Sequence, residues 1–318
     1  MSTRHLIAAE LLPGLDLAPE INLSTDTLGE MRQLLDETFT LDEEEYTHPE
    51  VEIEHLSVAH AFDGPDVKII VYKPRNSIGS IPAYVSIHGG GYVVGTADLS
   101  GPGNVRTAAE VGCMVASVDY RLAPETRAPG AVEDCYSALK WLHENADELG
   151  VDRNRIAIGG ESAGGGLAAA LALFAHDQGE FNVCFQVLIY PMLDDRTAAG
   201  ENDNPHTGEF LWTNESNAFG WGSLLGEEPG GDNVSPYAAA ARATDLSNLP
   251  PAYISVGSLD LFLEENIDYA TRMLRAGVNV ELHIFPGAYH GYEMAAESRI
   301  AIQSEKERRD ALKRAFTA

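Results

Sequence analysis

The sequence predicts an α/β fold built around a mostly parallel sheet. Strand-like and helix-like segments alternate from about residue 51 to the end of the chain, and short connections join most of them. This alternation is typical of βαβ units in an open, twisted sheet. Four strand segments are apolar almost throughout, at residues 83–88, 114–117, 156–158 and 187–189. Such runs indicate central parallel strands that helices cover on both faces.

The first 50 residues are acidic and have a helical pattern. Thr27 and Glu30 match a capping box, which predicts that a helix begins here. An apolar stripe with helical spacing follows, formed by Leu28, Met31, Leu34 and Leu35. We expect residues 1–50 to form a segment of their own beside the sheet.

Residues 51–193 and 250–318 are predicted to form the core. Its strands are expected at residues 51–60, 67–73, 83–88, 114–120, 155–159, 184–190, 252–256 and 280–285. Helical patterns fall between and after these strands, at residues 104–111, 130–149, 163–175, 264–276 and 293–316. Because each helix separates two strand segments or closes the chain, the pattern is that of a single sheet wrapped by helices.

Residues 194–249 interrupt the alternation. They contain no good strand, many turn residues and an aromatic group, namely Phe210, Trp212, Phe219 and Trp221. An excursion of this length is too long for a connecting loop and should carry helices of its own. Together with residues 1–50, it is expected to form a helical cap over one edge of the sheet.

The composition narrows the classes of function. The 318-residue chain has 49 Asp and Glu against 21 Lys and Arg, a formal charge of −28, so its surface should repel nucleic acid and anionic membranes. No apolar run reaches the roughly 20 residues that span a bilayer. The three cysteines are odd in number and widely spaced, which favours neither a disulfide framework nor a zinc site. With no secretory pattern at the start, these features predict a cytoplasmic protein.

The strongest chemical signal is the segment Gly160-Glu161-Ser162-Ala163-Gly164, between a predicted strand and a predicted helix. A G-x-S-x-G sequence at a strand-to-helix turn is the pattern of a nucleophile elbow. The turn forces strained backbone angles on Ser162 and exposes its hydroxyl at the carboxyl edge of the sheet, where ligands bind in such folds. The alternative is a glycine-rich turn with a purely structural role.

A second signal is His88-Gly89-Gly90-Gly91, directly after an apolar strand. Three glycines in this place let backbone N–H groups face a ligand, and acyl transfer needs such donors for the developing oxyanion. The alternatives are a flexible hairpin or a phosphate-binding loop. The following Tyr92-Val93-Val94 supplies neither the Lys-Ser/Thr nor the helix-opening glycine pattern of a phosphate loop.

A serine nucleophile needs a histidine base, which a carboxylate holds in place. Asp260 and His290 each follow a predicted strand, so both are expected at the same sheet edge as Ser162, in the order Ser, acid, His. Glu264 and Glu265 compete with Asp260 but fall inside the next predicted helix. Among the ten histidines, His283 lies within a strand and others lack a suitable context.

These motifs, with the segment Asp119-Tyr120-Arg121-Leu122-Ala123-Pro124-Glu125, resemble the hormone-sensitive-lipase-like esterases, the bacterial family IV carboxylesterases. The resemblance spans about residues 65–295. It implies an eight-stranded α/β-hydrolase core under a helical cap, no metal or cofactor, and hydrolysis of esters with acyl chains of about two to eight carbons. It also suggests a homodimer joined through the last strand of the sheet.

The resemblance assigns a role to individual residues. Ser162 would be the nucleophile, His290 the base and Asp260 the residue that orients it, and the N–H groups of Gly89, Gly90 and Ala163 would form the oxyanion hole. Further residues would support these, namely His88, Gly91, Asp119, Tyr120, Arg121 and Glu161. Two departures leave the subgroup and substrate open: Glu161 stands where many relatives have Asp or Thr, and Leu261-Phe262-Leu263 replaces a commoner pattern after the acid.

Four aromatic residues are candidates for the substrate pocket, Tyr92, Phe210, Trp212 and Trp221, and the alternative for each is packing within the cap. The acidic surface favours neutral over anionic esters. The sequence therefore predicts a serine carboxylesterase acting on a small ester. The alternatives are an amide or formamide hydrolase or a small-molecule deacetylase with the same triad, and a non-catalytic receptor, which the joint presence of Ser162 and His290 disfavours.

Overall fold

A computed structural model describes residues 2–39, 44, 46–199 and 204–317. Its centre is an eight-stranded sheet with the order β1-β2-β4-β3-β5-β6-β7-β8. The strands are β1 (Val51–Val58), β2 (Val67–Pro74), β3 (Ile81–Ile87), β4 (Met114–Asp119), β5 (Val151–Glu161), β6 (Phe185–Ile189), β7 (Ala252–Gly257) and β8 (Val280–Phe285). β2 pairs antiparallel with β1 and with β4, and the other neighbours pair in parallel. The predicted mostly parallel sheet is confirmed, and β5 is longer at both ends than the sequence suggested.

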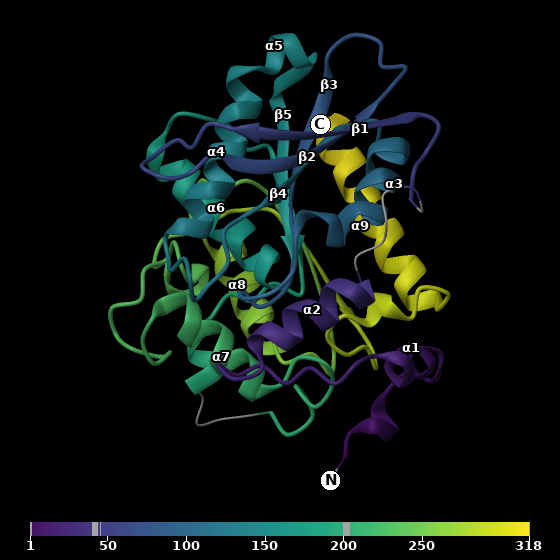
Figure 1. The fold of residues 1–318 in the computed structure, drawn as a ribbon, viewed down its shortest axis with the longest axis vertical. Helices are drawn as coiled ribbons and strands as arrows, with labels where there is room; N and C mark the ends of the chain where they lie inside the picture. The colour runs from purple at the N-terminus through teal and green to yellow at the C-terminus, as the bar shows by residue number, and fades with distance from the viewer. Residues whose placement is uncertain (1, 40–43, 45, 200–203, 318) are drawn as a thin grey trace.

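Helices cover both faces of the sheet (Figure 1). On one face lie α4 (Gly130–Glu144), α6 (Ala163–Gln178) and α8 (Leu263–Arg275), and on the other α3 (Gly101–Val111) and α9 (Arg299–Thr317). Neighbouring strand residues point to opposite sides, so Val85 joins the core cluster of α4, α6 and α8, whereas Tyr84 joins that of α3 and α9. This two-sided burial explains why the central strands are apolar throughout.

Two predicted helices differ from the structure at their ends. The helix predicted over residues 130–149 is divided into α4 and α5 (Ala146–Leu149), because the Asn145 side chain donates to the carbonyl of Trp141 at 2.8 Å and closes α4. The helix predicted from residue 293 begins only at Arg299. Ser298 caps it, since its hydroxyl accepts the N–H of Ala301 at 3.1 Å.

The N-terminal part contains α1 (Leu12–Leu17) and α2 (Leu28–Phe39). The predicted capping box of Thr27 and Glu30 is wrong. Instead, Thr27 pairs with Ser24: each hydroxyl accepts the other residue's N–H, at 3.2 and 3.0 Å. The stripe on α2 is also narrower than predicted, because Leu34 is 36% exposed while Leu28 and Leu35 are buried.

Residues 194–249 carry helices of their own, as predicted: in the described parts, 194–199 and 204–249, these are α7 (Asn214–Leu225) and the short 3-10 helices η5 (Asp195–Ala199) and η6 (Ala240–Arg242). Thr213 caps α7 by accepting the N–H of Ser216. Figure 1 shows α2 and α7 at the same end of the sheet, although residues 40–213 separate them in the chain.

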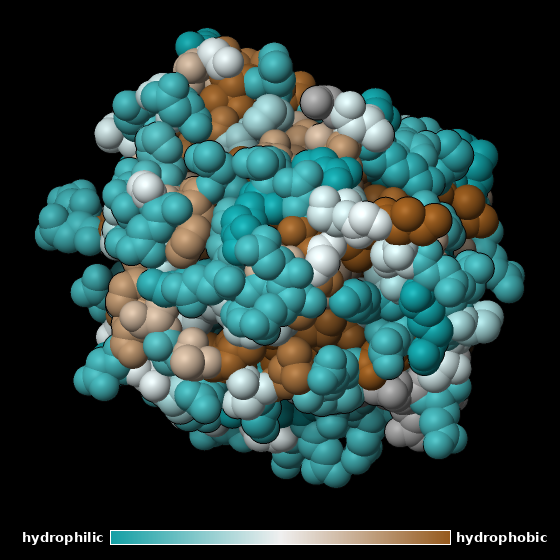
Figure 2. Space-filling model, turned by 90° about the horizontal axis from the view of Figure 1, so that it is seen from above, coloured by the Kyte–Doolittle hydropathy of each residue, from teal (hydrophilic) through white to brown (hydrophobic). Residues whose placement is uncertain are grey.

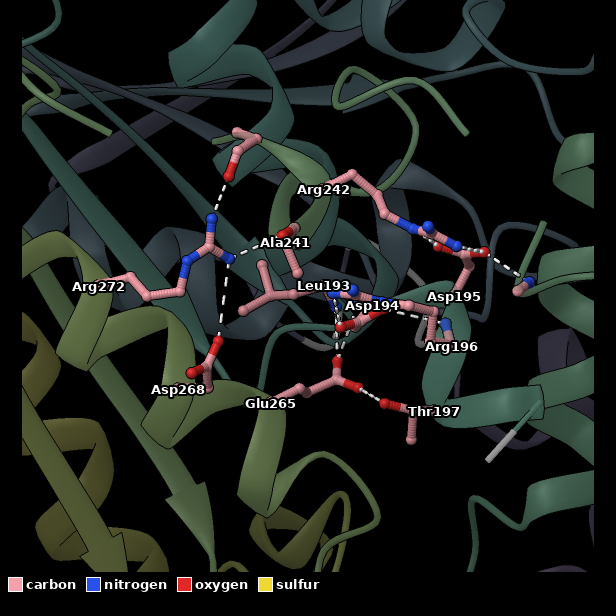
Figure 3. A network of polar contacts seen from close by, with 12 residues as sticks. Leu193, Asp194, Asp195, Arg196, Thr197, Ala241, Arg242, Glu265, Asp268 and Arg272 are labelled. Atoms are coloured by element: carbon pink, nitrogen blue, oxygen red, sulfur yellow. Dashed lines mark hydrogen bonds and ion pairs between the residues drawn. The ribbon is translucent and has the colours of Figure 1, made fainter. Parts of the chain in front are cut away.

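A buried polar network fixes both ends of this excursion to α8 (Figure 3). The Glu265 carboxylate accepts the N–H of Leu193 at 2.6 Å and a hydroxyl from Thr197. Arg272, two turns further along α8, donates to the carbonyl of Ala241 at 2.7 Å. Asp195 and Arg242 link the two ends with a pair of contacts at 2.7 and 2.8 Å. The excursion is therefore held at its base to the helix that follows Asp260.

The face of the molecule seen from above is mostly hydrophilic, with smaller hydrophobic areas between the polar side chains (Figure 2). Within the part of the chain that the structure describes, no helix combines the length and the apolar character that crossing a bilayer requires.

Candidate active site

Ser162 lies in the sharp turn between the end of β5 and the start of α6. Its backbone angles, φ 57° and ψ −121°, are strained for a residue with a side chain. The turn also packs tightly against the end of β3: a side chain at Gly164 would place its Cβ 2.1 Å from the carbonyl oxygen of Ile87. Glycine is therefore required at this position, and the hydroxyl of Ser162 projects at the carboxyl edge of the parallel strands.

The structure brings Ser162, His290 and Asp260 together. His290 Nε2 lies 2.9 Å from Ser162 Oγ, and His290 Nδ1 lies 2.8 Å from Asp260 Oδ2. With the proton of the neutral imidazole on Nδ1, the ring donates to Asp260 and accepts from the Ser162 hydroxyl. Asp260 is fully buried, and its other oxygen accepts the N–H of Phe262 at 2.9 Å, which fixes the carboxylate.

The competing residues lie elsewhere. Glu264 is exposed and accepts from Asn204 at 3.0 Å, and Glu265 belongs to the network that holds residues 193–197. His283, on β8, contacts Glu281 at 2.8 Å and Glu307 at 3.2 Å. Of the carboxylates considered, Asp260 is the one that meets His290.

The loop after β3 lies beside Ser162. A Cβ at Gly89 would lie 3.5 Å from the Cβ of Ser162, so the loop backbone reaches the nucleophile. Ala163 is the first residue of α6, and the N–H groups of a first helical turn have no acceptor within the helix. The glycine loop and the start of α6 therefore both lie next to Ser162.

His88 supports this loop through a hydrogen bond and through ring stacking. Its Nδ1 donates to the carbonyl of Gly89 at 2.7 Å, and its ring stacks on that of Tyr120 at a centroid distance of 4.2 Å. The Tyr120 hydroxyl donates to the carbonyl of His88 at 3.1 Å. Burial lowers the pKa of His88 to about 4, so the ring is neutral at pH 7 and acts through packing and hydrogen bonding.

Asp119 and Arg121 were also predicted to support the site, but their contacts differ. Asp119 accepts the N–H of Ala97 at 3.3 Å and so holds the segment that follows the loop. The Arg121 side chain, by contrast, turns away and binds Asp134 of α4 at 2.7 Å. Arg121 therefore joins two core elements, because the buried Asp134 carboxylate attracts its guanidinium.

A pocket opens at Ser162, with a volume of about 790 Å³ that includes the part open to solvent. Its lining combines the glycine loop, the Ser162–His290 pair and side chains from both helical segments: Ile21, Leu35, Asp36, Gly89, Gly90, Gly91, Val94, Gly95, Leu99, Glu161, Ser162, Tyr190, Trp212, His290 and Gly291. Of the four predicted pocket residues, Trp212 alone belongs to this lining.

The other three aromatic candidates are wrong as pocket residues. Tyr92 and Trp221 are fully buried against each other, with ring centroids 5.2 Å apart, and the Tyr92 hydroxyl donates to the carbonyl of Met192. Phe210 packs edge-on against Tyr289. These rings hold the excursion on the core, which is the packing alternative for such residues.

Several lining residues could not be assigned to the pocket from the sequence. Ile21, Leu35 and Asp36 come from the N-terminal segment, and Tyr190 follows β6. The amphipathic pattern of α2 identified Leu35 as apolar and inward-facing but gave no reason to place it over Ser162. Tyr190 packs edge-on against the His290 imidazole at a centroid distance of 4.7 Å.

Three half-buried charged residues, Glu161, Glu293 and Arg308, lie close together beside the nucleophile turn. Glu161 pairs with Arg308 of α9 at 2.5 Å, which gives this residue a role that its position in the motif did not reveal. Glu293 accepts from the Tyr190 hydroxyl at 2.9 Å. Burial, with the nearby Glu161 charge, raises the pKa of Glu293 to about 8.

Among the described residues, no three His, Cys, Asp or Glu side chains are grouped so that they could hold a metal ion. Cys113 and Cys135 are buried free thiols, and Cys184 is a half-buried one.

Known proteins share this arrangement over most of the chain. Residues 84–294 match a family model described as alpha/beta hydrolase fold. The chain is 37% identical over 246 residues to the carboxylesterase NlhH of Mycobacterium tuberculosis, covering 77% of this chain and 76% of that protein. It is 33% identical over 232 residues to an arylesterase of Saccharolobus solfataricus, covering 70% of this chain and 74% of that one. The solved structure of a bacterial heroin esterase matches with a TM-score of 0.94 and 40% identity, covering 100% of both chains.

These matches confirm the fold and the family that the motifs predicted. The family model covers well over half of the chain, and the similarity to the solved esterase structure extends through all strands of the sheet. The chain therefore belongs to the α/β-hydrolase-fold family, among its hormone-sensitive-lipase-like esterases.

Proposed function

We propose that this chain is a serine carboxylesterase that hydrolyses short- to medium-chain acyl esters through an acyl-enzyme intermediate. The observation that carries the proposal is the hydrogen-bonded chain from Ser162 through His290 to Asp260, at 2.9 and 2.8 Å, beside a glycine loop. The esterase names of the similar proteins support the same reaction class.

In the proposed reaction, a group of the site performs each step. Ser162 Oγ attacks the ester carbonyl carbon while His290 Nε2 takes the hydroxyl proton, and Asp260 stabilises the resulting imidazolium. The N–H groups of Gly89, Gly90 and Ala163 donate to the oxyanion. His290 then gives its proton to the alcohol oxygen as the carbon–oxygen bond breaks. Water repeats the sequence on the acyl-enzyme and releases the acid.

The division of the chain follows from these roles. Residues 51–193 and 250–318 form the catalytic core, and residues 1–50 and 194–249 form the cap that limits the length of the acyl chain. Apolar side chains such as Leu35 and Trp212 suit a hydrocarbon acyl group, and the acidic surface disfavours an anionic one.

A series of p-nitrophenyl esters tests the proposal. We expect the highest kcat/KM for acyl chains of about two to eight carbons, and labelling of the protein by a fluorophosphonate. Ser162→Ala should lower kcat by about 10⁶-fold and abolish labelling. Ser77→Ala, an exposed serine between β2 and β3, is the matched control and should behave as wild type. A maximum at long chains would overturn the chain-length assignment.

A matched anilide, assayed beside the ester series, tests two other functions. Faster hydrolysis of an anilide than of the matched ester would indicate an amide hydrolase with the same triad. Binding of esters without turnover or labelling would indicate a receptor. Both would contradict the esterase proposal.

The proposal extends to the state of the protein in the cell. We propose a homodimer joined through β8, which lies at one edge of the sheet and leaves Ile284 44% exposed. Light scattering should give twice the chain mass, and Ile284→Lys should give the mass of one chain.

The three free thiols favour the reducing cytoplasm as the location of the protein, which fractionation of the source cells would test.

A further inference from the structure

Tyr190 lies where the segment after β6 passes the nucleophile. The Ser162 N–H donates to the carbonyl of Ile189 at 2.9 Å, and the Ser162 carbonyl accepts the N–H of Met192 at 3.0 Å. Residues 189–192 therefore bracket the backbone of Ser162 through hydrogen bonds on both sides of Tyr190. This segment holds the nucleophile in addition to the glycine loop and the start of α6.

The backbone of Tyr190 has an unusual conformation. Its φ is +34°, in the left-handed region that favours glycine and is costly for a bulky side chain. The neighbouring elements hold it there: the Tyr190 N–H donates to the carbonyl of Ser255 on β7 at 2.5 Å, and the Asn266 amide donates to the carbonyl of Pro191 at 2.7 Å. Residues with such backbone angles persist where the surroundings over-determine them, and they are common at active sites.

The side chain of this strained residue packs against the His290 imidazole. The two ring centroids lie 4.7 Å apart, with an angle of 61° between the ring planes. Phe262 packs edge-on against the same imidazole at 5.2 Å, and Trp212 lies further from it, at 6.2 Å. Aromatic contacts of this kind limit rotation of the imidazole, and the ring electrons attract the imidazolium that forms during the reaction.

The hydroxyl of Tyr190 anchors the ring in this place. It donates to Glu293 Oε2 at 2.9 Å. Burial raises the pKa of the Tyr190 hydroxyl well above its usual value, so the hydroxyl keeps its proton and remains the donor. Glu293 belongs to the short 3-10 helix η7 (Tyr292–Met294), directly after His290. The segment that carries the imidazole therefore also holds the ring that packs against it.

We propose that Tyr190 is a positioning residue, which holds the His290 imidazole in the orientation that directs Nε2 at Ser162 Oγ. The inference rests on the proposed function, because it concerns the same nucleophile and base. Tyr190 also lines the Ser162 pocket, so contact with the acyl chain is the alternative role. Positioning acts on kcat for every ester, whereas a pocket wall acts on KM and on the preferred chain length.

Two substitutions separate the ring from the hydroxyl. Tyr190→Leu removes the ring, and Tyr190→Phe removes the hydroxyl alone. Tyr237 offers matched controls, because its ring packs edge-on against Phe174 at 5.1 Å and its hydroxyl donates to the Asp177 carboxylate at 2.6 Å. Tyr237 is not among the lining residues of the Ser162 pocket. Tyr237→Leu and Tyr237→Phe therefore remove the same groups outside the site.

The measured quantities are kcat and KM on p-nitrophenyl acetate and hexanoate, per active site counted by complete fluorophosphonate labelling. We expect Tyr190→Leu to lower kcat by about 10- to 100-fold on both esters, because misplacing a reacting group by about 1 Å can cost about 10²-fold. Tyr190→Phe should lower kcat by about 2- to 5-fold, since the ring remains but its anchor is lost. KM and the preference between the two esters should stay within about twofold, and both Tyr237 variants should behave as wild type.

Two results would overturn the inference. One is a kcat in Tyr190→Leu within about twofold of wild type. The other is a change in KM or in chain-length preference without a fall in kcat, which would make Tyr190 a pocket wall. Thermal melts show whether each variant is folded. If Tyr190→Leu does not fold, Tyr190→Phe decides, and a wild-type kcat in that variant would contradict the proposed anchor.

The rate of fluorophosphonate labelling tests the inference without ester turnover. Labelling needs the Ser162 hydroxyl and the His290 base, so its rate should fall in Tyr190→Leu by a factor similar to that for kcat. An unchanged labelling rate would overturn the positioning role. If the wild type hydrolyses neither ester while its labelling rate depends on Tyr190, the esterase proposal fails and the positioning role stands.

Discussion

The carboxyl edge of the sheet and the two helical segments above it are built in different ways. At the sheet edge, Ser162, Asp260 and His290 each lie on a turn that directly follows β5, β7 or β8. Parallel strands bring these turns to one edge, so His290, 128 positions from Ser162, meets Ser162 within hydrogen-bond distance, and Asp260, 98 positions from Ser162, meets His290. In the helical segments, pocket residues such as Leu35 and Trp212 reach the site through packing between distant parts of the chain.

Because of this difference, we expect the sheet edge to determine catalysis and the helical segments to determine substrate specificity. Residues of the sheet edge are tied to backbone turns and hold the reacting groups in place. Residues of the helical segments line the pocket, and their segments are anchored by side chains such as Arg32 on α2 and Glu265 on α8. Substitutions at the sheet edge should therefore change kcat, whereas substitutions in the helical segments should change which ester is preferred.

The largest effect is expected at the sheet edge. Asp260→Asn should lower kcat by about 10⁴-fold, because an amide cannot stabilise the imidazolium and favours the wrong tautomer of His290. KM should change little. The matched control is Glu264→Gln, an exposed carboxylate four residues away, which should retain wild-type kcat. Steady-state kinetics on p-nitrophenyl acetate measure both, and a near-normal kcat in Asp260→Asn would show that another carboxylate orients the histidine.

An intermediate effect is expected where the two regions touch. A Cβ at Gly91 would lie 2.0 Å from the Trp212 ring, and the φ of Gly91 is +57°. Gly91→Ala should lower the free energy of unfolding by about 2–4 kcal/mol through overpacking and backbone strain, as urea denaturation would measure. Gly29→Ala, on α2 with open space around it, should be neutral or stabilising.

A second substitution separates the two causes of this loss. Trp212→Leu in the Gly91→Ala protein removes the colliding ring and should recover part of the lost stability. Recovery should be incomplete because the backbone strain remains. If Gly91→Ala is as stable as wild type, the helical segment is not packed on the glycine loop as the structure has it.

The smallest effect concerns Glu293, which faces the Glu161 carboxylate of β5, the Arg308 guanidinium of α9 and the Tyr190 hydroxyl. The pKa of Glu293 is about 8 in the folded chain and about 4.3 in an unfolded one. Between these two pH values the folded state binds more protons than the unfolded state, so the free energy of unfolding falls as the pH rises.

Glu293→Gln removes this pH-dependent loss of stability and keeps an acceptor for the Tyr190 hydroxyl. Its Tm relative to wild type should rise by about 2–4 °C between pH 5 and pH 9. A constant difference would contradict the assignment.

Prediction from sequence succeeded where a local pattern carries the information. Each of the eight strands was expected from its residue types, and Ser162, Asp260 and His290 were expected at one edge from their places after strands. It failed at Thr27 and Glu30, where Ser24 offered a competing cap, and at Tyr92, Phe210 and Trp221, where an aromatic residue gives no local sign of facing a pocket or a core.

By itself, the sequence determined the sheet, the strained turn at Ser162 and the residues that lie at its edge. Strand periodicity, glycine positions and chain order fix these features through the backbone, which obeys the same rules wherever the segment occurs. Tertiary structure alone decided that Asp36 and Trp212 border the pocket, that Glu161 meets Arg308, and that Arg121 turns toward Asp134. Such contacts depend on how elements far apart in the chain pack together, and their packing energy is shared among many residues of both partners.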